Sequence, residues 1–63
     1  MIEKIWEMIQ NNREDYRLLS NGIEVENCEY GYYYFNRKTR EYVTIGLDKG
    51  LNVVYILFEK QPR

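Results

Sequence analysis

The chain has 63 residues, a formal net charge of −1 at neutral pH, no histidine and a single cysteine. This length allows one domain, residues 1–63, and the composition excludes an internal disulfide, histidine-based catalysis and the usual zinc ligand sets. The near-neutral charge gives no general attraction to nucleic acid, and no apolar run reaches the roughly 18 residues that span a bilayer. We therefore expect a cytoplasmic protein that is not an enzyme, binds no metal or cofactor, and does not enter membranes.

The N-terminal segment has the periodicity of an amphipathic helix. Apolar side chains recur at i, i+3, i+4 and i+7 and so form one stripe, made of Ile2, Ile5, Trp6 and Ile9. Asn11-Asn12 is a suitable end, because asparagine tolerates the left-handed backbone conformation that closes helices. A helix with one apolar stripe can cover one side of a sheet.

The segment after the helix allows two interpretations. Asn21-Gly22 is a strong signal for a type I′ hairpin, because both central residues of that turn need positive φ. Such a hairpin would place Leu18 opposite Val25 on one face of a short N-terminal strand. Alternatively, the helix continues to Ser20 and Gly22 closes it. We prefer the hairpin, and the two interpretations differ in whether this segment is strand or helix.

Three longer strands follow, because β-branched, aromatic and other apolar side chains dominate residues 28–35, 40–47 and 51–60. Turn residues separate the strands at residues 36–39 and 48–50. The register that these turns imply pairs Tyr32 with Val43 and Ile45 with Val53. The sequence thus predicts an α+β domain: one amphipathic helix on a small antiparallel sheet, a meander of three main strands plus a short N-terminal hairpin strand.

In this register the sheet is apolar on both sides, although an antiparallel sheet with one wet side usually alternates apolar and polar residues. One face carries Cys28, Tyr30, Tyr32, Val43, Ile45, Leu47, Val53, Tyr55 and Leu57. The second face carries Tyr33, Phe35, Tyr42, Thr44, Val54, Ile56 and Phe58. Because a single helix can cover only one face, the second face must curl into a covered core, pack on a second copy, or receive a foreign protein.

The second face and the basic turn beside it form the candidate partner-binding site. An exposed apolar patch of several hundred Å² usually marks an interface, and tyrosine offers a large contact area with few rotatable bonds. Basic side chains at the turn would orient docking. The predicted partner-binding residues are Tyr33, Phe35, Tyr42, Val54, Ile56, Phe58, Arg37, Lys38 and Arg40. We expect a small non-enzymatic protein-binding module that self-associates, binds a host protein, or does both.

The same hairpin supports a second hypothesis, weak nucleic-acid binding. Proteins that bind single strands combine a positive groove with aromatic stacking platforms, and Tyr33, Phe35 and Tyr42 lie beside the basic turn. The acidic residues within 24–29 carry an equal and opposite charge, which argues against this hypothesis.

The chain contains no alanine and is rich in residues with AT-rich codons, chiefly Asn, Ile, Lys and Tyr. In this composition and in its size it is similar to small phage or mobile-element proteins that bind and modulate a host protein. That similarity carries no residue-level assignment.

Overall fold

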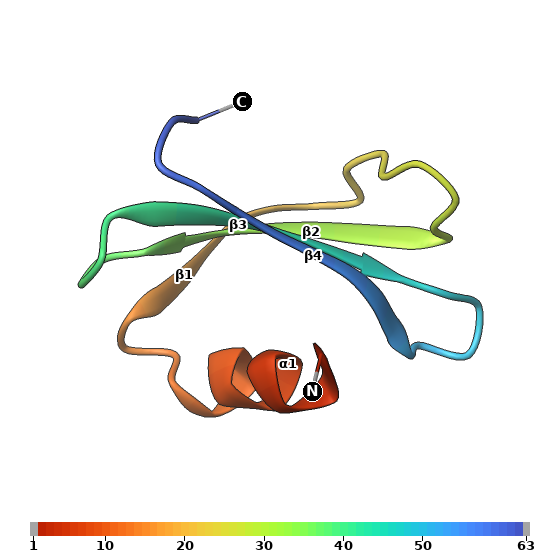
Figure 1. The fold of residues 1–63 in the computed structure, drawn as a ribbon, viewed down its shortest axis with the longest axis horizontal. Helices are drawn as coiled ribbons and strands as arrows, with labels where there is room; N and C mark the ends of the chain where they lie inside the picture. The colour runs from red at the N-terminus through yellow and green to blue at the C-terminus, as the bar shows by residue number, and fades with distance from the viewer. Residues whose placement is uncertain (1, 63) are drawn as a thin grey trace.

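The computed structural model describes residues 2–62 as one helix followed by a four-stranded antiparallel sheet. The elements are α1 (Ile2–Asn11), β1 (Tyr16–Asn21), β2 (Tyr30–Asn36), β3 (Glu41–Leu47) and β4 (Val53–Glu59). The strands lie side by side in chain order, so β1 and β4 form the two edges of the sheet. Figure 1 shows α1 on one side of the twisted sheet, which confirms the predicted α+β architecture.

The apolar stripe of α1 packs against one side of the sheet, which we call the helix face; the opposite side is the far face. The core between helix and sheet consists of Ile9, Tyr16, Val43, Ile45, Leu47 and Val53, with Ile2, Ile5, Trp6, Tyr32, Tyr34 and Ile56 partly buried against it. Trp6 stacks on Tyr32 with 6.0 Å between ring centroids and meets Tyr34 edge-on at 6.2 Å. The predicted stripe is therefore confirmed, since each of its residues packs in this core.

β1 is a strand, as the hairpin interpretation required, and not an extension of the helix. The predicted two-residue hairpin is nevertheless wrong, because β1 pairs with β2 and places Leu18 opposite Tyr34. Gly22, at φ 76°, donates its N–H to the Gly31 carbonyl at 2.8 Å, and residues 22–29 then form a long connection. This connection buries Val25, which a solvent-facing hairpin strand would leave partly exposed.

The register between β2 and β3 differs from the predicted one by two residues: Val43 faces Tyr34, and Ile45 faces Tyr32. The cause is Asn36, which pairs with Glu41 as the last residue of β2. Its side-chain oxygen accepts the N–H groups of Lys38 and Thr39 at 2.9 and 3.1 Å and so shapes the turn over residues 37–40. A shift of two residues keeps every side chain on its predicted face.

The turn between β3 and β4 is longer than predicted. The Asp48 carboxylate accepts the N–H groups of Gly50 and Asn52, both at 2.9 Å, and the Asp48 N–H donates to the Asn52 carbonyl at 2.9 Å. Leu51, at φ 65°, adopts a positive φ in this turn. The closed turn spans residues 48–52, so β4 begins only at Val53.

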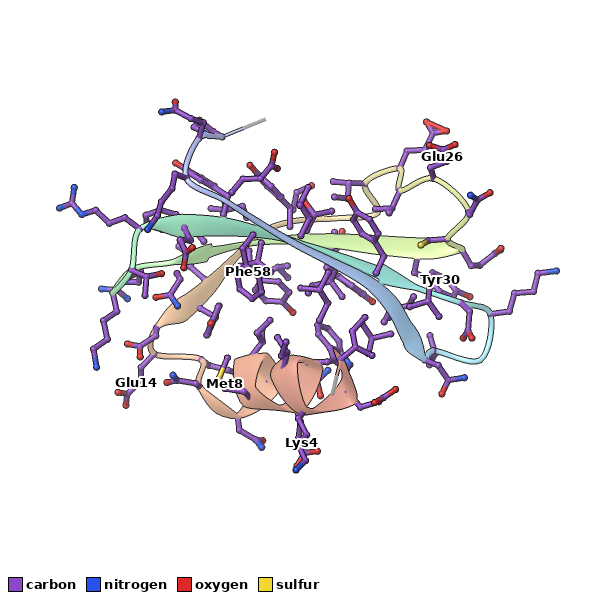
Figure 2. The ribbon with its side chains drawn as sticks, in the orientation of Figure 1. Lys4, Met8, Glu14, Glu26, Tyr30 and Phe58 are labelled. Atoms are coloured by element: carbon purple, nitrogen blue, oxygen red, sulfur yellow. The ribbon has the colours of Figure 1, made fainter. Side chains whose placement is uncertain are left out.

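A β-bulge at the start of β4 then places the side chains that follow it on the faces opposite to those predicted. Leu47 faces Val53 and Gly46 faces Tyr55, so Val54 is an extra residue on β4. An extra residue reverses the faces of those that follow it. Ile56 and Phe58 therefore lie on the helix face, where Figure 2 shows Phe58, and Tyr55 and Leu57 lie on the far face. The predicted faces of these four residues are wrong, and Ile45 pairs with Ile56 instead of Val53.

Candidate protein-binding surface

One end of the far face is covered by the chain itself. Gly31 and Gly46 lie opposite each other on β2 and β3 and leave the backbone bare. A side-chain carbon at Gly31 would meet Ile23 and Val25, and one at Gly46 would meet the Cys28 sulfur. The connection of residues 22–29 thus lies over this end, on the side opposite α1, as Figures 1 and 2 show for the segment that carries Glu26. Cys28 is half-buried there, on the far face, and not on the same face as Leu47, where we predicted it.

The aromatic side chains predicted for the far face do gather there. Tyr33 stacks on Tyr42 at 5.8 Å between ring centroids, and Phe35 contacts Tyr42 at 4.9 Å. Beside them, Thr44 is fully buried between Tyr33 and Leu57, its neighbours across the sheet. Because the rings are half-buried against one another, this part of the far face is a small second core more than an open platform.

Exposed apolar side chains lie on both edge strands: Leu18 and Leu19 on β1, and three residues on β4. Val54 is 49% exposed, Phe58 39% and Tyr55 36%, whereas Ile56 packs against the core. As an edge strand, β4 turns half of its backbone N–H and C=O groups away from the sheet. We call this surface the β4 edge: the outer backbone of Val53–Glu59 with the side chains of Val54, Tyr55 and Phe58.

The opposite edge is less suited to pairing. β1 contains a bulge in its middle, because Leu18 faces Tyr34 while Ser20 faces Tyr33, which leaves Leu19 as the extra residue. Bulges at an edge twist the strand and interrupt the ladder that another strand would extend. The bulge of β4 lies near its start, so residues 55–59 form a regular segment. Of the two edges, β4 is the one that can accept a further strand.

The basic turn is exposed and lies beside the C-terminal end of the β4 edge, where the Lys60 ammonium donates to the Thr39 carbonyl at 3.5 Å. Arg37, Lys38 and Arg40 lie in the turn between β2 and β3, whereas Val54 lies at the opposite end of the sheet, next to Gly46 and Leu47. Acidic groups offset the turn's charge: Glu14 and Asp15 share a shallow depression with Arg37 and Lys38. Because Ile56 packs against the core and Phe58 lies on the helix face, the nine predicted residues do not form one continuous patch.

The structure also places side chains together that the sequence analysis did not connect. A cavity of about 330 Å³ lies beside the C-terminal end of α1, and its lining residues are Ile9, Gln10, Arg13, Tyr16, Arg17, Leu18, Tyr34 and Arg37. The arginines come from the α1–β1 turn, from β1 and from the β2–β3 turn. No local motif could have revealed them, because only the pairing of β1 with β2 brings these segments together.

Within residues 2–62, no group of three or more Cys, Asp or Glu side chains is arranged to hold a metal ion. In the same part of the chain, α1 lacks the length and apolar character needed to cross a membrane. The chain matches no protein-family model, and no curated protein or solved structure is significantly similar to it.

Proposed function

We propose that this chain is a small non-enzymatic protein-binding module that self-associates by pairing the β4 edges of two copies. The observation that supports the proposal best is that Val54, Tyr55 and Phe58 remain exposed on a strand with an unshared edge. Sheet edges that combine free backbone groups with apolar side chains readily accept another strand. A chain of this size also has a small core, so burial of further apolar surface would add to its stability.

The sequence of β4 suits a second copy of itself. In an antiparallel pair centred on Ile56, Tyr55 would lie opposite Leu57 of the partner copy, and Val54, at the bulge that precedes the regular segment, would lie near Phe58. Both contacts join apolar side chains, and apolar cross-strand pairs are favourable in an antiparallel ladder. Such a pair has a two-fold axis, and both copies use the same surface. No β4 edge is left for a third copy, so the assembly stops at a dimer.

A foreign protein is the competing occupant of this edge. An extended apolar segment of a host protein would add to β4 through the same backbone groups. In that case the isolated chain is a monomer. Substitutions in the β4 edge would then weaken binding of the foreign protein and would not change the oligomeric state of the chain. The oligomeric state of the isolated chain therefore distinguishes a second copy from a foreign protein as the occupant of the β4 edge.

Sedimentation velocity over a range of concentrations tests the proposal. We expect the wild type to form dimers and Val54→Lys to be monomeric, because a lysine on an edge strand opposes pairing. Leu51→Lys is the matched control, since Leu51 is 61% exposed but lies in the preceding turn. A wild type that stays monomeric at all concentrations, or a Val54→Lys variant that dimerises as well as Leu51→Lys, contradicts self-association through β4.

One observation favours nucleic-acid binding as a second candidate. Arg17 is exposed and lies opposite Phe35, so it extends the positive charge of the basic turn toward β1. Single-stranded oligonucleotides should then bind with an affinity that falls steeply with salt and with Tyr33→Ala. Stacking of Tyr33 on Tyr42 occupies one face of each ring, which makes this the weaker candidate.

A further inference from the structure

The cavity beside the C-terminal end of α1 exists because the helix does not cover the whole helix face. α1 packs most closely against β4, at the far side of the sheet from β1. Near β1, Ile9 and Tyr16 are buried, but Leu18 stays 45% exposed opposite the half-buried Tyr34. The uncovered space between these side chains is the cavity of about 330 Å³.

The charged residues around this cavity are all basic. Arg13 and Arg37 line it together with Gln10, and Arg17 also borders it, although its register position opposite Phe35 belongs to the far face. No carboxylate among residues 2–62 lines the cavity. The nearest acidic residues in the chain, Glu14 and Asp15, line the neighbouring depression together with Arg37 but do not line the cavity, and Asp15 also accepts a hydrogen bond from the Asn12 side chain at 3.0 Å. Within residues 2–62, none of these three guanidinium groups forms an ion pair.

One group in the cavity wall, the Tyr34 hydroxyl, has a pKa that depends on this charge. Burial raises the pKa of the Tyr34 hydroxyl above its ordinary value of 10.0, and the positive charge of Arg13 opposes the rise. Arg13 and Tyr34 line the same cavity. Together with Arg37 and the Gln10 amide, Arg13 offers several hydrogen-bond donors next to an aromatic and an aliphatic side chain.

We propose that this cavity binds a small organic phosphate, whose phosphoryl oxygens are held by Arg13 and Arg37 and whose organic part lies against Tyr34 and Leu18. Guanidinium groups form paired hydrogen bonds with phosphate oxygens, and a doubly charged anion matches more than one arginine. The cavity volume falls at the small end of the range of small-molecule sites, roughly 300 to 1,000 Å³. The apolar wall indicates a ligand with a hydrophobic part in preference to inorganic phosphate alone.

An NMR titration of the ¹⁵N-labelled chain with phenyl phosphate tests this proposal. We expect saturable shifts at the amides of Gln10, Arg13, Leu18 and Arg37, with weaker binding of inorganic phosphate. Arg13→Gln and Arg37→Gln should each weaken phenyl phosphate binding about tenfold, because each removes a charge-assisted hydrogen bond. Arg40→Gln is the control: it removes the same charge from an exposed turn residue that does not line the cavity.

Several results would overturn the proposal. Shifts that do not saturate, or an equal loss in Arg40→Gln, would show only a general charge effect. Benzoate binding as tightly as phenyl phosphate would make the cavity a site for any anion. An oligonucleotide that binds far more tightly than phenyl phosphate, and that depends on Lys38 and Arg40, would assign this region to nucleic acid. Thermal melts monitored by circular dichroism confirm beforehand that each variant is folded.

Discussion

Gly31 lies directly opposite Gly46 on neighbouring strands, and the side chain of Val25 reaches over both of them. These two positions form a bare strip of backbone on the far face. The connection of residues 22–29 fills this strip with Ile23, Val25 and Cys28. The chain thus covers one end of the far face without a second helix.

Gly46→Ala should destabilise the protein, because its new methyl group would meet the Cys28 sulfur and lie 3.1 Å from Val25 and Tyr55 carbon atoms. Overpacking of this kind costs about 1–3 kcal/mol, measured as the free energy of unfolding in urea. Cys28→Ala should recover part of the loss in the double variant, since contacting residues couple. Equal stability of Gly46→Ala and Gly50→Ala, the latter at an exposed turn, would contradict the packing of this connection on the far face.

Thr44→Val should stabilise the protein. The Thr44 hydroxyl is fully buried and has no hydrogen-bond partner among the described residues. Replacing such a group with a methyl group of similar shape removes a desolvation penalty of about 1 kcal/mol or more. Chemical denaturation measures the difference, and Thr39→Val in the exposed turn is the control expected to change little. A less stable Thr44→Val would mean that a bound water satisfies the hydroxyl.

Ile56→Ala should destabilise the protein much more than Val54→Ala, although the two residues lie only two positions apart in the apolar segment 53–58. Ile56 packs against the core, so its truncation should cost about 2–3 kcal/mol. Val54 is the exposed extra residue of the bulge, and its truncation should cost about 0.5 kcal/mol or less in the monomer. Urea unfolding at low protein concentration measures both, and similar costs would contradict the bulge at Val54.

Asp48 should contribute a pH-dependent part of the stability. Its pKa lies below the ordinary value of 3.8, chiefly because the backbone N–H of Asn52 donates to the carboxylate, with further hydrogen bonds from the Asn52 side chain and the Gly50 N–H. A carboxyl whose pKa is lower in the folded state stabilises the fold above its unfolded pKa, and this stabilisation is lost as the pH falls through the folded pKa.

The Asp48→Asn variant tests this contribution, because the amide can still accept hydrogen bonds but does not titrate in this range. Its stability should fall less than that of the wild type as the pH is lowered below 3.8. Thermal melts across this acidic range measure the slope, and Asp15→Asn serves as a control outside the turn. Identical slopes for wild type and Asp48→Asn would exclude the proposed role of the carboxylate.

The local features of this fold could be predicted from the sequence. The stripe of Ile2, Ile5, Trp6 and Ile9 has only one helical interpretation, and its packing is confirmed. The aromatic residues of β2 were also assigned to the correct faces, since the register error of two residues keeps side chains on their sides. These predictions succeed because helix periodicity and strand alternation depend on neighbouring residues alone.

The faces of β4 could not be predicted in this way. All six residues from Val53 to Phe58 are apolar or aromatic, so alternation does not distinguish one side from the other. The Asp48 side chain closes a longer turn, and the bulge at Val54 then reverses the faces. The observed arrangement packs Ile56 against the core beside Val53, and such packing is a property of the assembled core.

The sequence by itself determined the helix, the number and order of the main strands, and the aromatic content of the sheet. Only the tertiary structure decided which apolar side chains remain exposed and which basic residues meet. The β4 edge depends on strand order and on a bulge, and the arginine-lined cavity depends on three segments brought together by β1–β2 pairing. The reason is physical: periodicity reports short-range geometry, whereas exposure and charge clustering arise from contacts between residues far apart in the chain.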